Sequence, residues 1–139
     1  MKQKYLGIDL GEKRIGLAVS DELGMLAHPL QTLVFTNIDK LVSDLRKIID
    51  DHNISGMVIG IPYTMKGLHS KKTAEILTQV DELKGKISVP VFTIDERLTT
   101  KMAQDALHAA GKKTGKSRSI IDQVAAVYIL QSFLDSQKR

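Results

Sequence analysis

Acidic residues occur at three separate places in the chain where their chemistry could matter. Asp9 lies in the middle of a strand-like run, although strands are depleted of Asp. Asp95 and Glu96 follow a second such run, at the carboxyl end of a strand, where α/β sheets usually place their sites. Asp122 begins an apolar helical stripe. Carboxylates are the ligands that Mg²⁺ and Mn²⁺ prefer, so three convergent acids could bind metal ions for phosphodiester hydrolysis.

Each of the three places also has a structural interpretation. Asp9 could be a solvent-facing residue beside a turn. Asp95 or Glu96 could stabilise the start of the next helix through its dipole, with Arg97 as an ordinary ion-pair partner. Asp122 and the serine three residues before it fit a capping box, with Asp in place of Glu or Gln. The metal hypothesis therefore requires that folding bring the three places together.

Residues 112–118 form the most basic segment, with four cations in seven positions. These cations are Lys112, Lys113, Lys116 and Arg118. The segment directly precedes Asp122, so phosphates attracted to it would lie beside the acids. A solvated loop is the alternative, and the net charge of +4 favours a polyanionic partner only slightly.

The composition excludes several other classes of protein. The chain has 139 residues, which we interpret as a single domain over 1–139. It has no cysteine, which excludes disulfides, thiol catalysis and cysteine-ligated zinc. The four histidines are dispersed. No segment approaches the ~20 apolar residues of a membrane helix or resembles a signal peptide, so we expect a cytoplasmic protein with no membrane partner.

The first third of the chain predicts antiparallel strands. Runs at 4–10 and 14–20 are separated by residues 11–13, Gly-Glu-Lys, which predicts a hairpin. A third run over about 25–35 contains Pro29, which indicates an edge strand or an irregularity.

The rest of the chain alternates helices and strands. The predicted elements are helices over about 37–52 and 70–84, the second ended by Gly85, strands over 56–61 and 89–94, and helices over about 99–110 and 119–136. The order βββαβαβαα predicts an α/β fold with a mixed five-stranded sheet, three antiparallel strands followed by two parallel ones, flanked by helices.

Side-chain alternation gives Asp9 small neighbours. If the faces of the hairpin strands match, Asp9 stands on a strip formed by Gly7, Gly16 and Ala18, which leaves room for something to approach.

Four motifs, taken in order, closely resemble the YqgF (RuvX-like) family. They are Asp9-Leu-Gly-Glu-Lys-Arg14-Ile-Gly16-Leu-Ala18, Gly60-Ile-Pro62 through Gly67, Asp95-Glu-Arg-Leu-Thr-Thr100 and Asp122-Gln-Val-Ala-Ala126. The resemblance covers essentially the whole chain, with similar spacing. Proteins of this family are bacterial RNase H-like proteins described as Holliday junction resolvases or pre-16S rRNA nucleases.

The resemblance implies an RNase H-like nuclease that depends on Mg²⁺ or Mn²⁺ and processes the 5′ end of precursor 16S rRNA. Resolution of branched DNA is the alternative. It implies Asp9, Glu96 or Asp95, and Asp122 as catalytic acids. Metal ligands would be Asp9, Glu96 and Asp122, and nucleic-acid contacts would come from Arg14, Arg97, Lys112, Lys113, Lys116 and Arg118.

Two departures from the family pattern affect this expectation. RNase H-like nucleases often carry an acid at the end of the fourth strand, where this chain has Gly60-Ile61-Pro62, so the fifth strand must supply it. Tyr63-Thr64 replaces the Leu-Asn that often follows the proline, which weakens the case for loop 62–69 as a substrate contact.

Two other classes of function remain to be separated from a nuclease. Gly7 to Gly11 resembles the opening of the phosphate-binding lobe of actin-like ATPases, but those proteins need two lobes and this chain has the length of one. A non-catalytic nucleic-acid or ribosome-assembly factor is the second alternative. A monomer or a homodimer is compatible with the sequence, and symmetric junction resolution would favour the dimer.

Overall fold

The computed structural model describes residues 3–63, 70–96 and 118–137, and the side chains from residue 121 in the last of these ranges. The elements are β1 (Tyr5–Leu10), β2 (Arg14–Ser20), β3 (Ala27–Val34), α1 (Ile38–His52), β4 (Gly56–Ile61), α2 (Lys71–Lys86), β5 (Val91–Asp95) and α4 (Arg118–Ser136). The helix predicted over 99–110 lies outside the described residues. None of the described helices is long and apolar enough to cross a membrane.

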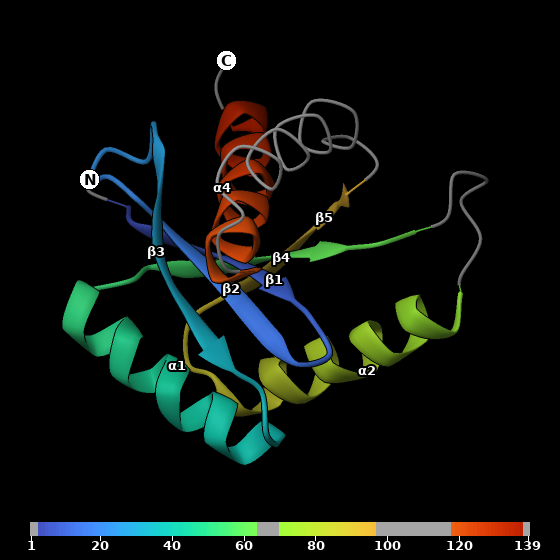
Figure 1. Cartoon of the computed structure of the whole chain (residues 1–139). Coiled ribbons are helices and arrows are strands. Elements are labelled where there is room, and N and C mark those ends of the chain that lie inside the picture. Colours follow the sequence, from blue (N-terminus) through green and yellow to red (C-terminus); the bar gives the residue numbers. More distant parts are fainter. Residues whose placement is uncertain (1–2, 64–69, 97–117, 138–139) are drawn as a thin grey trace.

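The strands form one sheet in the order β3-β2-β1-β4-β5 (Figure 1). β1 pairs with β2 and β2 with β3 in antiparallel fashion, whereas β1 pairs with β4 and β4 with β5 in parallel. The predicted mixed sheet is therefore confirmed. Asp9 lies opposite Gly16, and Gly7 opposite Ala18, which confirms the predicted strip of small residues.

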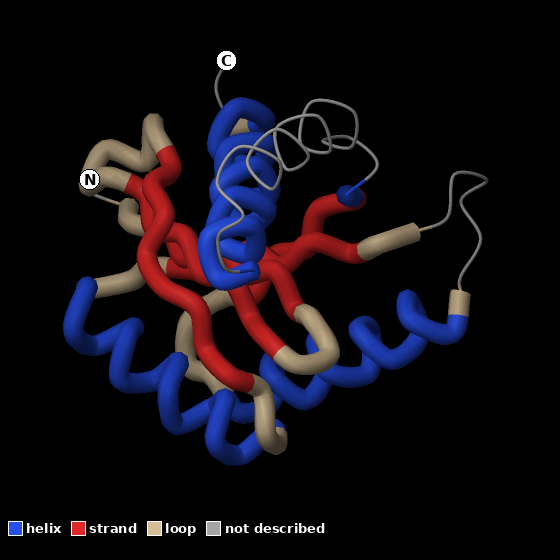
Figure 2. The backbone as a smooth tube through the Cα atoms, in the orientation of Figure 1, coloured by secondary structure: helices blue, strands red, loops and turns tan. Residues whose placement is uncertain are grey.

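Helices cover both faces of the sheet. α1 and α2 lie on one face, and α4 crosses the other (Figures 1 and 2). The larger core lies on the α1 and α2 face, where the alternate apolar residues of β1 and β2 meet both helices. A smaller core lies under α4; its buried residues are Ala18, Val58, Ala126, Ile129, Leu130, Phe133 and Leu134. All six residues of β4 are buried, as its continuous apolar run predicted.

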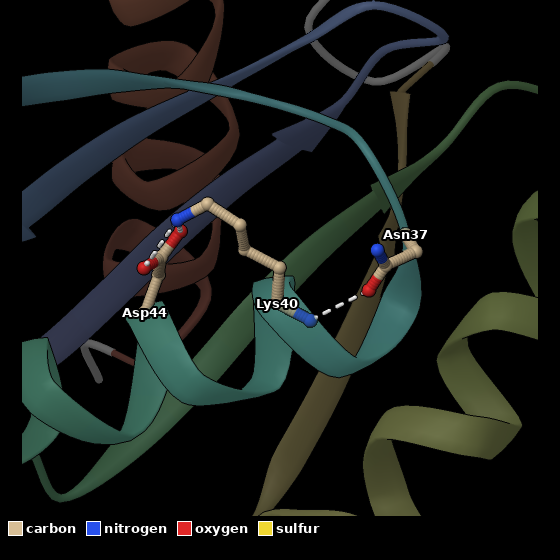
Figure 3. A network of polar contacts seen from close by, with 3 residues as sticks. All are labelled: Asn37, Lys40 and Asp44. Atoms are coloured by element: carbon tan, nitrogen blue, oxygen red, sulfur yellow. Dashed lines mark hydrogen bonds and ion pairs between the residues drawn. The ribbon is translucent and has the colours of Figure 1, made fainter.

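Local signals in the sequence define both ends of α1. The Oδ1 of Asn37 accepts a hydrogen bond from the backbone N–H of Lys40 at 2.9 Å, and Lys40 Nζ lies 3.3 Å from Asp44 one turn later (Figure 3). The helix ends at Asn53, which adopts a left-handed conformation with φ of 55°. Between these caps the buried side chains recur at helical spacing.

The two edge strands explain irregular features of the sequence. β3 lies at one edge, and its register with β2 shifts next to the pair Ala18 and Pro29, as the proline predicted. β5 lies at the other edge, and Phe92 is 39% exposed there. Among the described strands, β5 therefore has a neighbour on one side only.

The prediction that Gly85 ends the second helix was wrong. α2 continues to Lys86, and the backbone N–H of Ile87 bonds to the carbonyl of Leu83 at 2.9 Å. Ile87 is extended and buried, so the burial of this side chain fixes the end of the helix. Gly85 is exposed and has no heavy atom within 4 Å of the place where a Cβ would lie, so the helix tolerates it.

Candidate active site

Asp9 lies between two glycines on the face of the sheet that α4 covers. It pairs with Gly16 on β2. On the other side, the parallel pairing of Ile8 with Ile59 places Gly60 of β4 at the next position, beside Asp9. The carboxylate therefore projects from a central strand with no side chain on either adjacent strand position, and other groups can approach it closely.

Glu96 occupies the space above Gly60. A Cβ built on Gly60 would lie 2.7 Å from Oε1 of Glu96 and 2.8 Å from its Cγ. Alanine at this position would therefore collide with the glutamate side chain. The Glu96 carboxylate, which follows β5, thus lies over the end of β4, where this chain has no acid of its own.

Asp122 occupies the space above Gly16. A Cβ on Gly16 would collide with the carbonyl oxygen of Asp122 and lie 2.9 Å from its Cβ. The start of α4 therefore rests on β2 next to Asp9. The line of buried residues that continues from Asp122 along α4 is formed by Ala126, Ile129 and Phe133, as predicted.

Arg14 fixes the Asp122 carboxylate. Its Nε donates a hydrogen bond to Oδ2 of Asp122 at 2.9 Å, and the two side chains are 31% and 19% exposed. α4 begins at Arg118, so Ser119 lies inside the helix rather than before it. The structure therefore favours a site residue over the capping-box interpretation of Asp122.

The electrostatics show that the acids act on one another. Burial, and then the charge of Asp122, raise the pKa of Asp9 to about 6. Burial, and then the charges of Asp9 and Asp95, raise the pKa of Glu96 to about 7. In both cases Lys72 opposes the increase. Buried acids whose pKa values are raised by one another are typical of functional sites.

A model of the RuvX family, described as Holliday junction resolvase, matches residues 3–136. The chain belongs to this family. Similar curated proteins include one from Chloroflexus aggregans that is 37% identical, with 99% of this chain and 96% of that protein covered. Another, from Roseiflexus, is 38% identical, with 97% of this chain and 96% of that protein covered. Both are named as pre-16S rRNA nucleases, and the predicted resemblance is confirmed.

Solved structures confirm the RNase H-like fold of this RuvX-family chain. Thermus thermophilus RuvC in complex with a Holliday junction substrate has a TM-score of 0.58 at 15% identity, with 96% of this chain and 95% of that chain covered. The fowlpox virus resolvase with its Holliday junction substrate has a TM-score of 0.59 at 11% identity, with 99% and 100% covered.

Side chains alternate between the two faces of the sheet along β5, and this alternation distinguishes Asp95 from Glu96. Val91 packs into the core under α1 and α2, whereas Ile94 packs into the core under α4. Asp95 follows Val91 by an even number of positions and Glu96 follows Ile94 by two, so the pattern assigns them to opposite faces. Glu96 shares the face of Asp9. The geometry of this RuvX-family site therefore favours Glu96 where the sequence left both acids open.

Sequence reasoning did not single out Lys72, whose charge acts on the two buried acids. It lies in the first turn of α2 and lowers the pKa of both Asp9 and Glu96. The signal was present in the sequence, because two lysines, 71 and 72, follow the capping Ser70. Cations oppose the dipole at a helix N-terminus, so lysines in a first turn call for another explanation.

The residues at the RuvX-family site fit a divalent metal by their chemistry. Asp9, Glu96 and Asp122 offer only oxygen ligands, and the two glycines keep neighbouring Cβ atoms away from them. Over the described ranges, no three acidic or imidazole side chains already form a group that could hold an ion. Acids that face one another without a cation repel, so an ion would have to draw the carboxylates together.

Several predicted contacts cannot be placed against this site. Arg97 and the cations of the basic segment, Lys112, Lys113 and Lys116, lie outside the described residues, as do Thr100 and positions 64–69 of the loop after β4. Arg118 begins α4, but its side chain is not described.

Proposed function

We propose that this chain is a divalent-metal-dependent endonuclease that cleaves structured nucleic acid at the site around Asp9. One observation carries the proposal. Asp9 stands between two glycines, and the spaces above them are filled by Glu96 on one side and by the start of α4 with Asp122 on the other. Three acids from distant parts of the sequence therefore converge from three different elements.

The chain's own residues prepare the site to receive cations. Asp9, Glu96 and Asp122 would hold Mg²⁺ or Mn²⁺, which would activate water and stabilise the leaving oxygen of a phosphodiester. Arg14 orients Asp122 through its hydrogen bond. Because the pKa values of Asp9 and Glu96 are about 6 and about 7, both acids become fully ionised only above neutral pH unless a cation compensates them.

Precursor 16S rRNA is the substrate we favour, and we expect processing at its 5′ end in the cytoplasm by a single-domain enzyme. The names of the curated relatives support this choice. The chain has only three Tyr and three Phe, so recognition through the phosphate backbone and shape is more plausible than recognition by base stacking. A four-way DNA junction is the second candidate, because the matching family is described as a Holliday junction resolvase.

A cleavage assay tests this proposal. Precursor 16S rRNA with its 5′ extension, a four-way DNA junction and a linear DNA duplex are incubated with the protein in Mg²⁺, in Mn²⁺ and in EDTA. We expect metal-dependent cleavage of the precursor and loss of cleavage, with retained binding, in Asp9→Asn. Cleavage in EDTA, or full activity of Asp9→Asn, would overturn the proposal. Cleavage of the junction alone would select the second candidate.

A further inference from the structure

The first turn of α2 carries positive charges that oppose the helix dipole. Its first two residues are Lys71 and Lys72, and the turn contains no acid. Both lysines are exposed, and each opposes the positive end of the helix dipole. The helix dipole therefore does not favour lysines at these two positions.

The position of this turn relative to the acids is fixed by a buried hydrogen bond. Thr73 is completely buried, and its Oγ1 donates to the carbonyl of Pro62 at 2.7 Å. The backbone N–H of Thr73 in turn bonds to the capping Ser70 Oγ at 3.1 Å. Pro62 lies two residues beyond Gly60, where Glu96 rests. The start of α2 is thus tied to the edge of the sheet that carries the carboxylates.

The two lysines differ in their relation to the site. Lys72 acts electrostatically on both Asp9 and Glu96, whereas Lys71 does not contribute to the shift of either acid. Within the described parts of the chain, Lys72 forms no ion pair within 4.0 Å. Lys72 therefore acts on both carboxylates through its charge without forming an ion pair with either of them.

A site built from acids needs a cation to accept nucleic acid, because carboxylates and phosphates repel. Lysine is a common phosphate ligand that acts as a point charge on a flexible stem. We propose that Lys72 is a substrate-binding residue of this site, whose ammonium group contacts a phosphate of the strand that enters beside Asp9 and Glu96. This inference rests on the proposed nuclease function and extends it.

The competing role for Lys72 is that of an internal counter-ion to the carboxylates. The two roles predict opposite results. A counter-ion competes with metal, so its removal would tighten Mn²⁺ binding and leave nucleic-acid affinity unchanged. A phosphate ligand contributes to nucleic-acid affinity and to its dependence on salt.

The test compares Lys72→Gln with Lys71→Gln, a matched control in the same exposed turn. Affinity for precursor 16S rRNA and for a four-way junction is measured in Ca²⁺, in place of Mg²⁺, at several salt concentrations. Cleavage in Mg²⁺ and the affinity of each variant for Mn²⁺ are measured in parallel. We expect Lys72→Gln to weaken binding about 10-fold and to lower the salt slope by roughly one phosphate contact, with partial rescue by Lys72→Arg. The Lys71 variant should change both quantities less.

Equal effects of the two glutamine variants on affinity and salt slope would overturn the inference, as would tighter Mn²⁺ binding with unchanged nucleic-acid affinity. Circular dichroism melting of both variants checks that α2 is folded. The wild-type protein separates this test from that of the proposed function. If the wild-type protein does not cleave, the proposed nuclease function is contradicted. If it cleaves and Lys72→Gln changes neither the affinity nor the salt slope, only the phosphate contact is contradicted.

Discussion

Arg14 on β2 and Asp122 on α4 are 108 residues apart in the sequence, and the Nε of Arg14 donates to Oδ2 of Asp122 at 2.9 Å. This contact ties the last helix to the hairpin that carries Asp9. The sequence suggested that Arg14 supports the site or contacts nucleic acid, and we infer a positioning role from its hydrogen bond to Asp122. A planar guanidinium can orient a carboxylate in a way that a lysine ammonium cannot.

Replacement of Arg14 by Lys should therefore weaken Mn²⁺ affinity and cleavage about 10- to 100-fold, as is typical of residues that orient metal ligands. Because the pair is partly exposed, the free energy of unfolding should change by only about 1 kcal/mol. Titration calorimetry with Mn²⁺, kcat measurements and thermal melts give the three quantities. Arg46→Lys is the control, because Arg46 bonds to the carbonyl of Lys86 in another part of the surface. If both variants retain wild-type metal affinity, Arg14 has no positioning role.

Gly60→Ala should damage both stability and activity. The new Cβ would lie 2.6 Å from Cδ1 of Ile129 and 2.7 Å from Oε1 of Glu96, so one or both must move. We expect a loss of about 1–3 kcal/mol in the free energy of unfolding, together with reduced cleavage. Gly85→Ala is the matched control, because its Cβ would meet nothing within 4 Å in an exposed part of α2. That change should stabilise the protein by about 0.5–1 kcal/mol. Urea unfolding gives the free energy of unfolding of both variants. The prediction is contradicted if Gly60→Ala is more stable than Gly85→Ala.

Asp95 and Glu96, at the end of β5, should differ in how much each contributes to metal-dependent cleavage. Glu96→Gln removes a carboxylate from the face of Asp9, so metal-dependent cleavage should fall at least about 100-fold. Asp95→Asn changes a residue that strand alternation assigns to the other face, so most activity should remain. Single-turnover cleavage of the same substrate compares the two. Greater loss in Asp95→Asn would show that the acid on the other face is the ligand.

The raised pKa values predict how stability depends on pH in metal-free buffer. Asp9 rises from 3.8 to about 6 and Glu96 from 4.5 to about 7, so the folded protein binds these protons more tightly than the unfolded chain. The resulting stability is fully present below about pH 4 and is lost as pH rises through 6 and 7. Asp9→Asn should therefore raise the melting temperature at pH 8 more than at pH 5. Its gain at pH 8 should be about 3 kcal/mol. An equal rise in melting temperature at both pH values would show that ionisation of Asp9 does not destabilise the folded protein.

Saturating Mn²⁺ should reverse this trend, because only the ionised acids bind metal. The wild-type protein should then gain stability between pH 6 and pH 8, whereas Asp9→Asn should gain little. Differential scanning fluorimetry with and without Mn²⁺ measures the difference. Equal stabilisation of both proteins by Mn²⁺ would place the cation elsewhere.

The sequence was sufficient for the part of the site that depends on local pairing. A hairpin with a short turn fixes its register, so alternation alone places Asp9 beside Gly16. The five-stranded sheet and its order of helices follow from the periodicity of each segment. The face of α4 that packs on the sheet was also predictable, because Asp122, Ala126 and Ile129 recur at helical spacing.

The other half of the site depends on contacts that sequence spacing does not determine. Gly60 lies beside Asp9 only because β1 and β4 pair in parallel, and about 50 residues separate them. The choice between Asp95 and Glu96 depends on which face each residue of β5 adopts. The start of α2, which carries Lys72, lies beside the end of β4 because the Thr73 hydroxyl donates to the carbonyl of Pro62. These relationships are tertiary, and the only local sign of any of them is the pair of lysines that begins α2.

Crystals of the protein with Mn²⁺, measured at a wavelength that gives an anomalous signal from the metal, provide the most direct test. The account predicts an anomalous peak about 2 Å from carboxylate oxygens of Asp9 and of Glu96 or Asp122. The peak should disappear in Asp9→Asn crystals grown in the same way. Full occupancy of Mn²⁺ at another place on the protein, with no density between these three acids, would contradict it.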